Sequence, residues 1–499
     1  MLNHVVEKTD EFISRRTKEE RKKLGQFFTS KSIAQYMASL FDVPKSSSIS
    51  VLDPGAGSGI LSAALVQWVE TQYDIVQEIN LTCYETNREV LPLLETNMKH
   101  LTQTSSLKLH ISIIKDNYLL SQSCDFSSKL LASANPLKYD WVICNPPYFK
   151  LNKNSPEALS MQSVCHGAPN IYFLFASMGL FNLKQNGEMV YIMPRSWTSG
   201  AYFTRFREYF LRYSRLTDIH IFTNRNNVFD KEQVLQETMI VKAKKIDATP
   251  VTVKISSSSG SDSFNRTTRI DVPYDVVVSG KQQFVYIPTS KEEIDVLRTI
   301  NCLEVSLPSI GLKMKTGLTI DYRNRELLRN ESDKHVVPLF YPFHLKSGRI
   351  IFPAGRNNEY MSDDSPGMLQ MNRNYLFVKR FTTIEEYRRL QCAVYLAKYY
   401  PAYAKISTEN KINFIDTIDN TEIGECLAFG LFTTFNSTIY DKYYRILNGS
   451  TQVNSSEINA IPMPDRHVLE QMGKITMNAN NFSTEFSDRI LKGIINVKN

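Results

Sequence analysis

The sequence predicts an α/β fold built on a doubly wound parallel sheet, followed by a second domain of mixed α+β structure. In the first half, apolar strand-like runs alternate with helix-like stretches, as a parallel sheet requires. The second half mixes Tyr- and Phe-rich strands with a Lys/Arg-punctuated helix around residues 385–400. Because 499 residues are too many for one ordinary core, we expect two domains, at residues 1–290 and 291–499.

The first predicted strand leads into a glycine-rich turn and then into a helix. Ile49–Leu52 is strand-like, Asp53–Gly59 contains three glycines, and Ile60–Val66 is helix-like. This order is typical of the opening of a doubly wound sheet, where glycines let a ligand approach the backbone closely. Taken alone, the turn is compatible with a dinucleotide as well as with S-adenosyl-L-methionine (AdoMet).

Three further strands are each followed by a polar residue. The strands are 80–84, 110–114 and 139–144, and the polar residues are Glu85, Asp116 and Asn145. Together with Asp53 they fall on the side of the sheet where such folds bind ligands. Glu85 is placed to bind ribose hydroxyls, and Asp116 suits an adenine amino group. A single acidic strand end is more often a solvated cap, but four polar ends in register favour a binding site.

The corner Asn145-Pro146-Pro147-Tyr148 suits methyl transfer to a planar, poorly nucleophilic nitrogen. Two consecutive prolines fix the backbone and withhold two N–H groups. The Asn145 carboxamide oxygen and the Pro146 carbonyl can then accept hydrogen bonds from an –NH₂ group, and the Tyr148 ring offers a stacking face. The alternative is a plain Pro-Pro turn at a strand end, which the glycine-rich turn upstream makes less attractive.

Later elements of the first domain continue the alternation. Asn170–Leu183 is expected to be a helix ended by Gly187, and Glu188–Pro194 a further strand. The serine-rich stretch Ser256–Ser261 fits a loop inside this domain better than a linker. Six arginines between residues 191 and 225 alternate with aromatic residues. They fit either a phosphate-gripping surface or the solvated face of an amphipathic helix.

Composition excludes several classes of protein. Seven cysteines without a Cys-x-x-Cys pair argue for reduced thiols, and no His/Cys/Asp cluster has metal-ligand spacing, so we expect no metal. The longest nearly apolar run, Ile171–Phe181, is too short to span a bilayer. The chain begins without a signal-peptide pattern. We therefore expect a cytoplasmic protein with no membrane contact.

Together these motifs resemble the Rossmann-like, AdoMet-dependent N6-adenine DNA methyltransferases of the TaqI-like (gamma) arrangement, which end in a target recognition domain. The segment Gly25–Ser30 resembles the one that closes over the AdoMet carboxylate. The resemblance implies AdoMet contacts from Thr29, Asp53, Pro54, Gly55, Ala56, Gly57, Glu85, Asp116 and Pro147. It implies a catalytic set of Asn145, Pro146, Pro147, Tyr148 and Phe229, with Phe229 covering the second face of the adenine. Since that amino group is paired inside a duplex, the adenine would be flipped out.

The second half resembles the recognition half of BsuBI/PstI-type enzymes. The phrases that carry this resemblance are Lys315–Leu318, Tyr341–His344, Asn374–Phe381 and Asn448–Asn454. It implies a restriction–modification methyltransferase that acts on double-stranded DNA, as a monomer, beside a separately acting cognate restriction endonuclease. A short palindrome such as CTGCAG is the recognition site that it suggests.

Other readings explain less of the chain. Protein glutamine N5-methyltransferases and rRNA guanine N2-methyltransferases also use this corner, but neither needs Gly25–Ser30 or some 250 further residues. A fused nuclease would need a Mg²⁺-binding acidic cluster, and Glu20-Arg21-Lys22 has too little chain before it. A non-catalytic DNA-binding module would have little reason to keep the full polar set.

Overall fold

The computed structural model describes residues 1–15, 28–127, 138–222, 238–260, 264–383 and 385–498. Its contacts divide the chain into two compact units. Unit 1 comprises Met1–Thr198, Tyr202–Val278 and Gln283–Thr289, and unit 2 comprises Ser199–Ala201, Ser279–Gln282 and Ser290–Asn499. The main division falls between Thr289 and Ser290.

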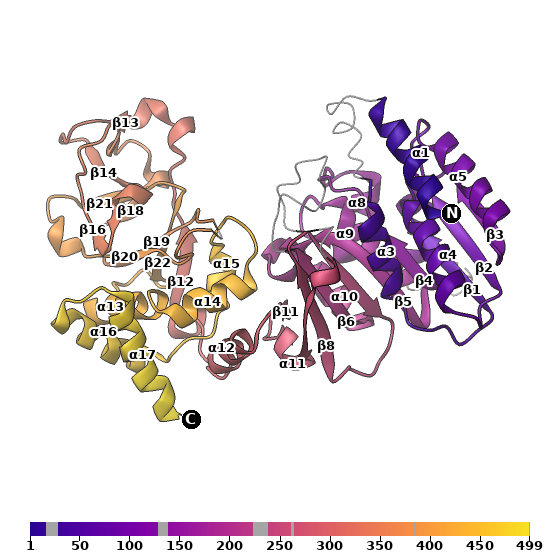
Figure 1. The fold of residues 1–499 in the computed structure, drawn as a ribbon. Coiled ribbons are helices and arrows are strands. Elements are labelled where there is room, and N and C mark those ends of the chain that lie inside the picture. The colour runs from indigo at the N-terminus through magenta and orange to yellow at the C-terminus, as the bar shows by residue number, and fades with distance from the viewer. Residues whose placement is uncertain (16–27, 128–137, 223–237, 261–263, 384, 499) are drawn as a thin grey trace. The chain divides into compact units, whose positions relative to one another are not determined.

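The described residues of unit 1 form a nine-stranded sheet in the order β3-β2-β1-β4-β5-β7-β6-β8-β9 (Figure 1). The strands β1 to β5 are parallel, and β7 runs antiparallel between β5 and β6. Their bounds are β1 (Ser48–Asp53), β2 (Glu78–Tyr84), β3 (Lys108–Ile114), β4 (Tyr139–Cys144), β5 (Leu183–Pro194), β6 (Arg215–Phe222), β7 (Thr238–Lys244), β8 (Thr252–Ser258) and β9 (Thr268–Pro273). The predicted α/β class is confirmed.

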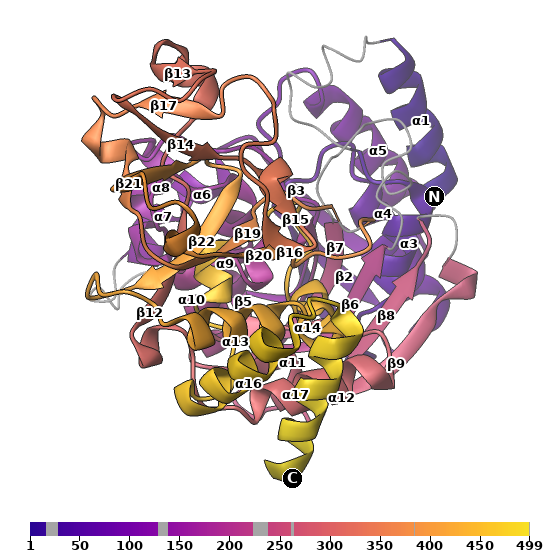
Figure 2. The ribbon, with the colours of Figure 1, turned by 90° about the vertical axis from the view of Figure 1, so that its left-hand side faces the viewer.

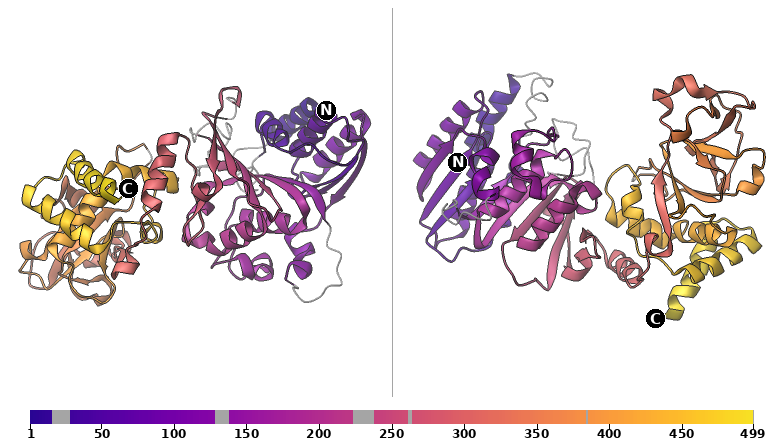
Figure 3. Two further views of the ribbon diagram at one scale, coloured as in Figure 1. Left: turned by 90° about the horizontal axis from the view of Figure 1, so that it is seen from below. Right: turned by 180° about the vertical axis from the view of Figure 1, so that it is seen from behind.

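Two groups of helices flank this sheet (Figure 3). The helices of the first group contact one another and are α1 (Leu2–Ser14), α3 (Lys31–Ser39), α4 (Ile60–Gln72) and α5 (Leu91–Thr104). The other is α6 (Tyr118–Ser121), α7 (Ser123–Ser127), α8 (Pro156–Ser160), α9 (Ile171–Asn182) and α10 (Thr204–Tyr213). Short elements follow at α11 (Tyr274–Val277), β10 (Val278–Ser279) and β11 (Phe284–Val285). Helices on both faces of a parallel sheet are what a doubly wound fold requires.

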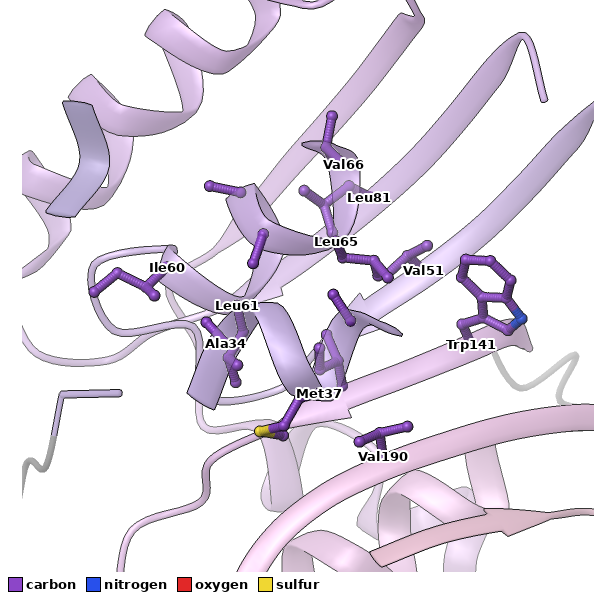
Figure 4. Close-up of a cluster of buried hydrophobic side chains, with 14 of the residues drawn as sticks. Ala34, Met37, Val51, Ile60, Leu61, Leu65, Val66, Leu81, Trp141 and Val190 are labelled. Atoms are coloured by element: carbon purple, nitrogen blue, oxygen red, sulfur yellow. The ribbon is translucent and has the colours of Figure 1, made fainter. Parts of the chain in front are cut away.

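The core of unit 1 fixes the turn between β1 and α4. Leu61 and Leu65 of α4 pack with Val51 of β1, Leu81 of β2 and Met37 of α3, all nearly inaccessible to water (Figure 4). Burial of each such side chain stabilises the fold by roughly 1.5–3 kcal/mol. The end of β1 and the start of α4 are therefore held on both sides.

Two local predictions met different outcomes. The helix expected at Asn170–Leu183 is α9, and the Asn170 side chain caps it by accepting a hydrogen bond from the Tyr172 N–H. The prediction of a loop for the serine-rich stretch is wrong for Ser256–Ser258, because these residues belong to strand β8. Ser256 bonds to Tyr36 at 2.9 Å and to His220 at 2.8 Å, so these serines serve packing inside unit 1.

Unit 2 is a mixed α+β structure with two small sheets in its described residues. The six-stranded sheet contains β12 (Leu312–Thr316), β22 (Ile412–Thr417), β19 (Tyr375–Lys379), β20 (Cys392–Tyr395), β16 (Gly348–Ile350) and β15 (Leu345–Lys346). The five-stranded sheet contains β13 (Leu328–Arg329), β17 (Tyr360–Ser362), β14 (Val336–Phe340), β21 (Lys405–Thr408) and β18 (Gln370–Met371). The predicted second architecture is confirmed.

Helices gather at one side of the six-stranded sheet (Figure 2). They are α12 (Lys291–Asn301), α13 (Glu425–Phe435), α14 (Thr438–Leu447), α15 (Ser455–Ile458), α16 (Arg466–Ala479) and α17 (Thr484–Lys498). Helices α13 and α16 touch at their backbones, because a Cβ at Gly430 would lie 1.9 Å from the Leu469 carbonyl oxygen. Only glycine allows that approach.

The helix expected around Glu385–Tyr400 is wrong. The chain there forms β20, whose residues are all buried, followed by a short 3₁₀ turn at Ala397–Tyr399. Strand β20 pairs with β19 on one side and β16 on the other. Two strand partners and full burial override the helix propensity of Ala, Leu and Lys.

Candidate active site

The turn between β1 and α4 adopts a left-handed backbone at two glycines. Gly57 has φ +57° and Gly59 has φ +84°. A Cβ at Gly59 would lie 2.4 Å from the Met98 Cε of α5, so the end of that side chain would have to move. The Ala56 N–H donates to the Tyr84 carbonyl of β2 at 3.0 Å. The turn is thereby held against β2 and α5.

A cavity of about 460 Å³ opens at the carboxyl edge of the parallel strands. That volume lies within the usual range of small-molecule sites. The predicted site residues that line it are Pro54, Gly55, Gly57, Glu85, Asp116, Asn145, Pro146 and Pro147. Around Gly55 three elements meet, because a Cβ there would lie 3.6 Å from the Phe175 ring of α9 and 3.8 Å from the Asn145 carbonyl oxygen. The structure thus brings the glycine turn and the proline corner into one site.

Asp53 and Ala56 lie beneath the turn rather than in the cavity wall formed by the described residues. Asp53 is fully buried, and its Oδ2 accepts a hydrogen bond of 2.8 Å from Ser62 Oγ of α4. Burial raises the pKa of Asp53 to about 7, and the nearby Glu85 charge adds to the rise. Asp53 therefore shapes the turn from within the core.

Glu85 is fixed by two backbone N–H groups. Its Oε2 accepts from Gly57 at 3.0 Å and its Oε1 from Asn87 at 2.7 Å. Burial raises the pKa of this carboxyl group above its ordinary value. A carboxylate oxygen has room for a second donor, so each oxygen that faces the cavity can also accept a hydroxyl group.

Asp116 follows β3 and is exposed at the rim of the cavity. The neighbouring Asn117 holds this stretch in place. Its side-chain oxygen caps α6 by accepting from Leu119 and Leu120, and its Nδ2 donates to Glu157 at 2.9 Å. Asp116 therefore presents an exposed acceptor on an anchored segment.

The carboxamide of Asn145 is bonded at both ends. Its Nδ2 donates to Thr29 Oγ1 at 3.1 Å, and its Oδ1 accepts from the Tyr148 hydroxyl at 2.6 Å. That hydroxyl also lies 2.8 Å from the Ile192 carbonyl oxygen. Burial raises the pKa of Tyr148 well above its ordinary value, so the hydroxyl keeps its proton. Thr29 and Tyr148 contact Asn145 and stand outside the cavity wall formed by the described residues.

Some predicted residues cannot be placed. Phe229 lies outside the described residues, as do Gly25 to Phe27 of the segment before α3. Phe28, the next residue of that segment, lines the cavity.

The described arginines between residues 191 and 225 do not all lie at the surface. Arg207 is fully buried, donates to the Trp197 carbonyl at 3.0 Å and stacks on Phe284 with its Cζ 5.2 Å from the ring centre. Arg205 and Arg215 also donate to backbone carbonyl oxygens. These three arginines stabilise unit 1, and Arg225 lies outside the described residues.

Several cavity residues were missed by the sequence interpretation. They include Tyr84, Asn87, Asn117, Phe149, Ile171 and Phe175. Asn117 and Phe149 directly follow predicted site residues, so extending each motif by one position would have found them. Phe175 belongs to α9, and only the tertiary packing brings that helix to Gly55.

Two further features concern metals and membranes. Within the described ranges, no group of three or more His, Cys, Asp or Glu side chains is arranged to hold a metal ion. Among the helices that the structure describes, none combines the length and apolar character that a bilayer crossing requires.

Comparison with known proteins gives consistent matches. The family model of the Eco57I restriction-modification methylase matches residues 66–229. The type II methyltransferase M.PstI of Providencia stuartii is 32% identical over 465 residues, which are 91% of this chain and 89% of that protein. M.BsuBI of Bacillus subtilis is 31% identical over 466 residues, 91% of this chain and 90% of that protein.

A solved structure of a nuclease-deletion mutant of the type ISP restriction-modification enzyme LlaGI, in complex with a DNA substrate mimic, covers 91% of this chain and 55% of that chain. It has 10% sequence identity and a TM-score of 0.49. The two type II enzymes match nearly end to end at more than 30% identity. The chain therefore belongs to the family of type II methyltransferases of restriction–modification systems.

Proposed function

We propose that this chain transfers the methyl group of AdoMet to N6 of an adenine flipped out of double-stranded DNA. The observation that carries the proposal is that Asn145 and Pro146 line the same cavity as Glu85 and Asp116. The proposed acceptors are Asn145 Oδ1 and the Pro146 carbonyl. The proposal includes a modification role in a restriction–modification system. A separately acting restriction endonuclease, a monomeric state and a cytoplasmic location remain predictions.

The residues of the cavity fit AdoMet. Glu85 offers its carboxylate to the ribose hydroxyls, and Asp116 offers an acceptor to the adenine amino group. Pro54, Gly55 and Gly57 present a backbone wall that a ligand can approach closely. Phe28 and Phe175 add apolar surface. When bound, AdoMet supplies an electrophilic methyl group.

The acceptor pair addresses the weak nucleophilicity of the target nitrogen, whose lone pair is delocalised into the adenine ring. If Asn145 Oδ1 and the Pro146 carbonyl accept both amino hydrogens, the nitrogen is drawn toward sp³ geometry and its lone pair becomes available. Fixed polar groups of this kind act by positioning and by preorganised electrostatics. This chemistry needs no protein nucleophile and no metal.

Stacking offsets the cost of moving the adenine out of the helix. Tyr148 is half-buried and would place its ring against one face of the base, and Phe229 is proposed for the other. Such a base–aromatic contact is worth roughly 1–3 kcal/mol.

We propose further that unit 2 reads the DNA sequence at one end of its six-stranded sheet. Three segments singled out in the sequence meet there: Lys315–Leu318, Asn374–Phe381 and Asn448–Asn454. Thr316 pairs with Asn413, Lys379 with Ile412, and Phe381 with Gln452. We call the residues at this end the recognition edge: Leu318, Lys379, Arg380, Phe381, Lys411 and Gln452. A site such as CTGCAG stays a prediction.

The side chains of the recognition edge suit a DNA groove. Leu318, Phe381 and Lys411 are exposed. The Arg380 guanidinium is half-buried and donates to the Asn410 carbonyl at 3.0 Å and to Gln452 Oε1 at 3.4 Å. Arginine reads guanine and glutamine reads adenine through the major groove. The bonded Arg380–Gln452 pair therefore supports base reading at the recognition edge.

One experiment tests the chemistry. Purified chain is incubated with methyl-labelled AdoMet, EDTA and two duplexes that differ only in a CTGCAG site or its scrambled form. We expect N6-methyladenine in the duplex that carries the site. A methyl group on cytosine, on RNA or on protein glutamine would overturn the proposed reaction, and methylation of both duplexes alike would overturn only the recognition site.

A further inference from the structure

Thr29 contacts the target-binding corner. It immediately precedes Ser30, the N-cap of α3, and is almost fully buried with 7% of its surface exposed. Its Oγ1 accepts the 3.1 Å hydrogen bond from Asn145 Nδ2. Its neighbour Phe28 lines the cavity, whereas Thr29 faces the carboxamide. In this structure the Thr29 hydroxyl bonds to the Asn145 carboxamide, and its contact with the AdoMet carboxylate stays a prediction.

The position of Thr29 is fixed by the packing of α3. The Ser30 side chain accepts a hydrogen bond from the Ile33 N–H, and α3 buries Ile33, Ala34 and Met37 completely in the core of unit 1. A hydroxyl group in a fixed position can restrain the orientation of a second side chain that bonds to it. Since Asn145 comes from the end of β4, the bond joins two segments 116 residues apart.

The plane of the Asn145 carboxamide decides whether its oxygen can accept an amino hydrogen. Rotation about the Cβ–Cγ bond would turn Oδ1 away, because this torsion is broad in an unrestrained side chain. The Tyr148 hydroxyl restrains Oδ1, but it has one hydrogen for two acceptors, Oδ1 and the Ile192 carbonyl. Thr29 restrains the other end of the same carboxamide through Nδ2.

We propose that Thr29 is a positioning residue for methyl transfer, whose hydroxyl group holds the Asn145 carboxamide in the plane that the target amino group requires. This inference rests on the proposed function. It makes Thr29 act on the rate of the chemical step through Asn145, and it separates Thr29 from Glu85, whose proposed partner is AdoMet itself.

The test compares Thr29→Val, which removes only the hydroxyl group, with Thr29→Ser, which keeps it. The single-turnover rate of methyl incorporation is measured at saturating AdoMet and DNA, and the AdoMet Kd by calorimetry. We expect Thr29→Val to lower that rate by roughly 10- to 100-fold, the size of effect that misplaced catalytic groups produce. Thr29→Ser should restore it to within about threefold, and the AdoMet Kd should stay within about threefold for both variants.

Thr9→Val serves as the matched control, because Thr9 is also buried in unit 1 and its hydroxyl donates within its own helix to the Val5 carbonyl. It should react at the wild-type rate. If Thr29→Val fails to fold by thermal melting, Thr29→Ala replaces it. An unchanged rate at saturating AdoMet, or a loss that serine does not restore, overturns the inference.

The outcome is independent of which base accepts the methyl group. Rates are measured as total incorporation, and the product nucleoside is identified separately in the wild-type reaction. Methylation of another base would overturn the proposed function while the Thr29 comparison could still be made.

Discussion

The carboxyl edge of the unit 1 sheet and the recognition edge of unit 2 are assembled in different ways. In unit 1, parallel strands deliver their ends to one edge, so Glu85, Asp116 and Asn145 meet because each follows a strand. In unit 2, antiparallel pairing joins distant segments, and Arg380 meets Gln452 across 72 positions of sequence. A site can be predicted from local motifs when the topology itself collects strand ends. Local motifs are not enough when the site forms between strands whose pairing is not known from the sequence.

The sharpest way to test this division is Asn145→Ala. If the carboxyl edge performs the chemistry and unit 2 performs recognition, the variant should lose methyl transfer by about 10²–10³-fold or more, the cost of removing one preorganised polar group. AdoMet and DNA binding should stay near wild type, because only polarisation of the amino group is lost. The measurements are the single-turnover rate of methyl transfer and binding isotherms for AdoMet and for DNA. Substantial turnover by Asn145→Ala would refute the mechanism.

A smaller loss is expected from Glu85→Ala. The substitution removes the acceptor proposed for ribose and also the anchor of the Gly57 and Asn87 N–H groups. AdoMet affinity should fall by roughly 10- to 100-fold, equal to about 1.4–2.8 kcal/mol.

The control for Glu85 is Glu78→Ala, at the opposite end of the same strand, where the side chain pairs with Lys108. It should bind AdoMet as the wild type does. Equal affinity of all three proteins would remove Glu85 from the cofactor site.

A substitution in unit 2 should weaken DNA binding and leave AdoMet binding unchanged. Arg380→Ala should weaken binding to the specific duplex by about 5- to 150-fold, the 1–3 kcal/mol that one base contact provides, with AdoMet affinity unchanged. The control is Arg466→Ala, an exposed arginine of α16 paired with Glu470. Both are measured against specific and scrambled duplexes at one salt concentration, since phosphate contacts weaken as salt rises. Equal loss on both duplexes would assign Arg380 to phosphate binding.

Particular residues show where the sequence was sufficient. The glycine turn was predicted to contact the cofactor, and Asn145, Pro146 and Tyr148 to hold the target adenine, because each is a short motif with a backbone consequence. Gly57 and Gly59 have the left-handed backbone that such a turn requires. The hydrogen bonds from Asn145 to Thr29 and from Tyr148 to Asn145 were not visible, since they form only once the chain is folded. The helix expected near Glu385 failed for the same reason, because its strand partners lie elsewhere in the chain.

The last prediction concerns the stability of unit 1 at Asp53, and it separates a core residue from a ligand-binding one. Its pKa is raised by burial to about 7 in the folded chain from an ordinary value of 3.8. Between about pH 4 and 7 the folded chain therefore keeps a proton that the unfolded chain has lost. The contribution of Asp53 to stability is fully present below this window and is lost as the pH rises through it.

The Asp53→Asn side chain cannot titrate. The melting temperature of this variant minus that of the wild type should therefore increase as the pH is raised from 5 to 8. Each pKa unit corresponds to about 1.4 kcal/mol, and each kcal/mol to roughly 2–4 °C in a domain of this size. Asp74→Asn, at an exposed position of unit 1, should instead run parallel to the wild type. A melting difference for Asp53→Asn that stays constant with pH would mean that the buried carboxyl group is ionised throughout. Asp53 would then belong with Glu85 as a charged group of the site, and the distinction between the turn's core support and its ligand-facing wall would fail.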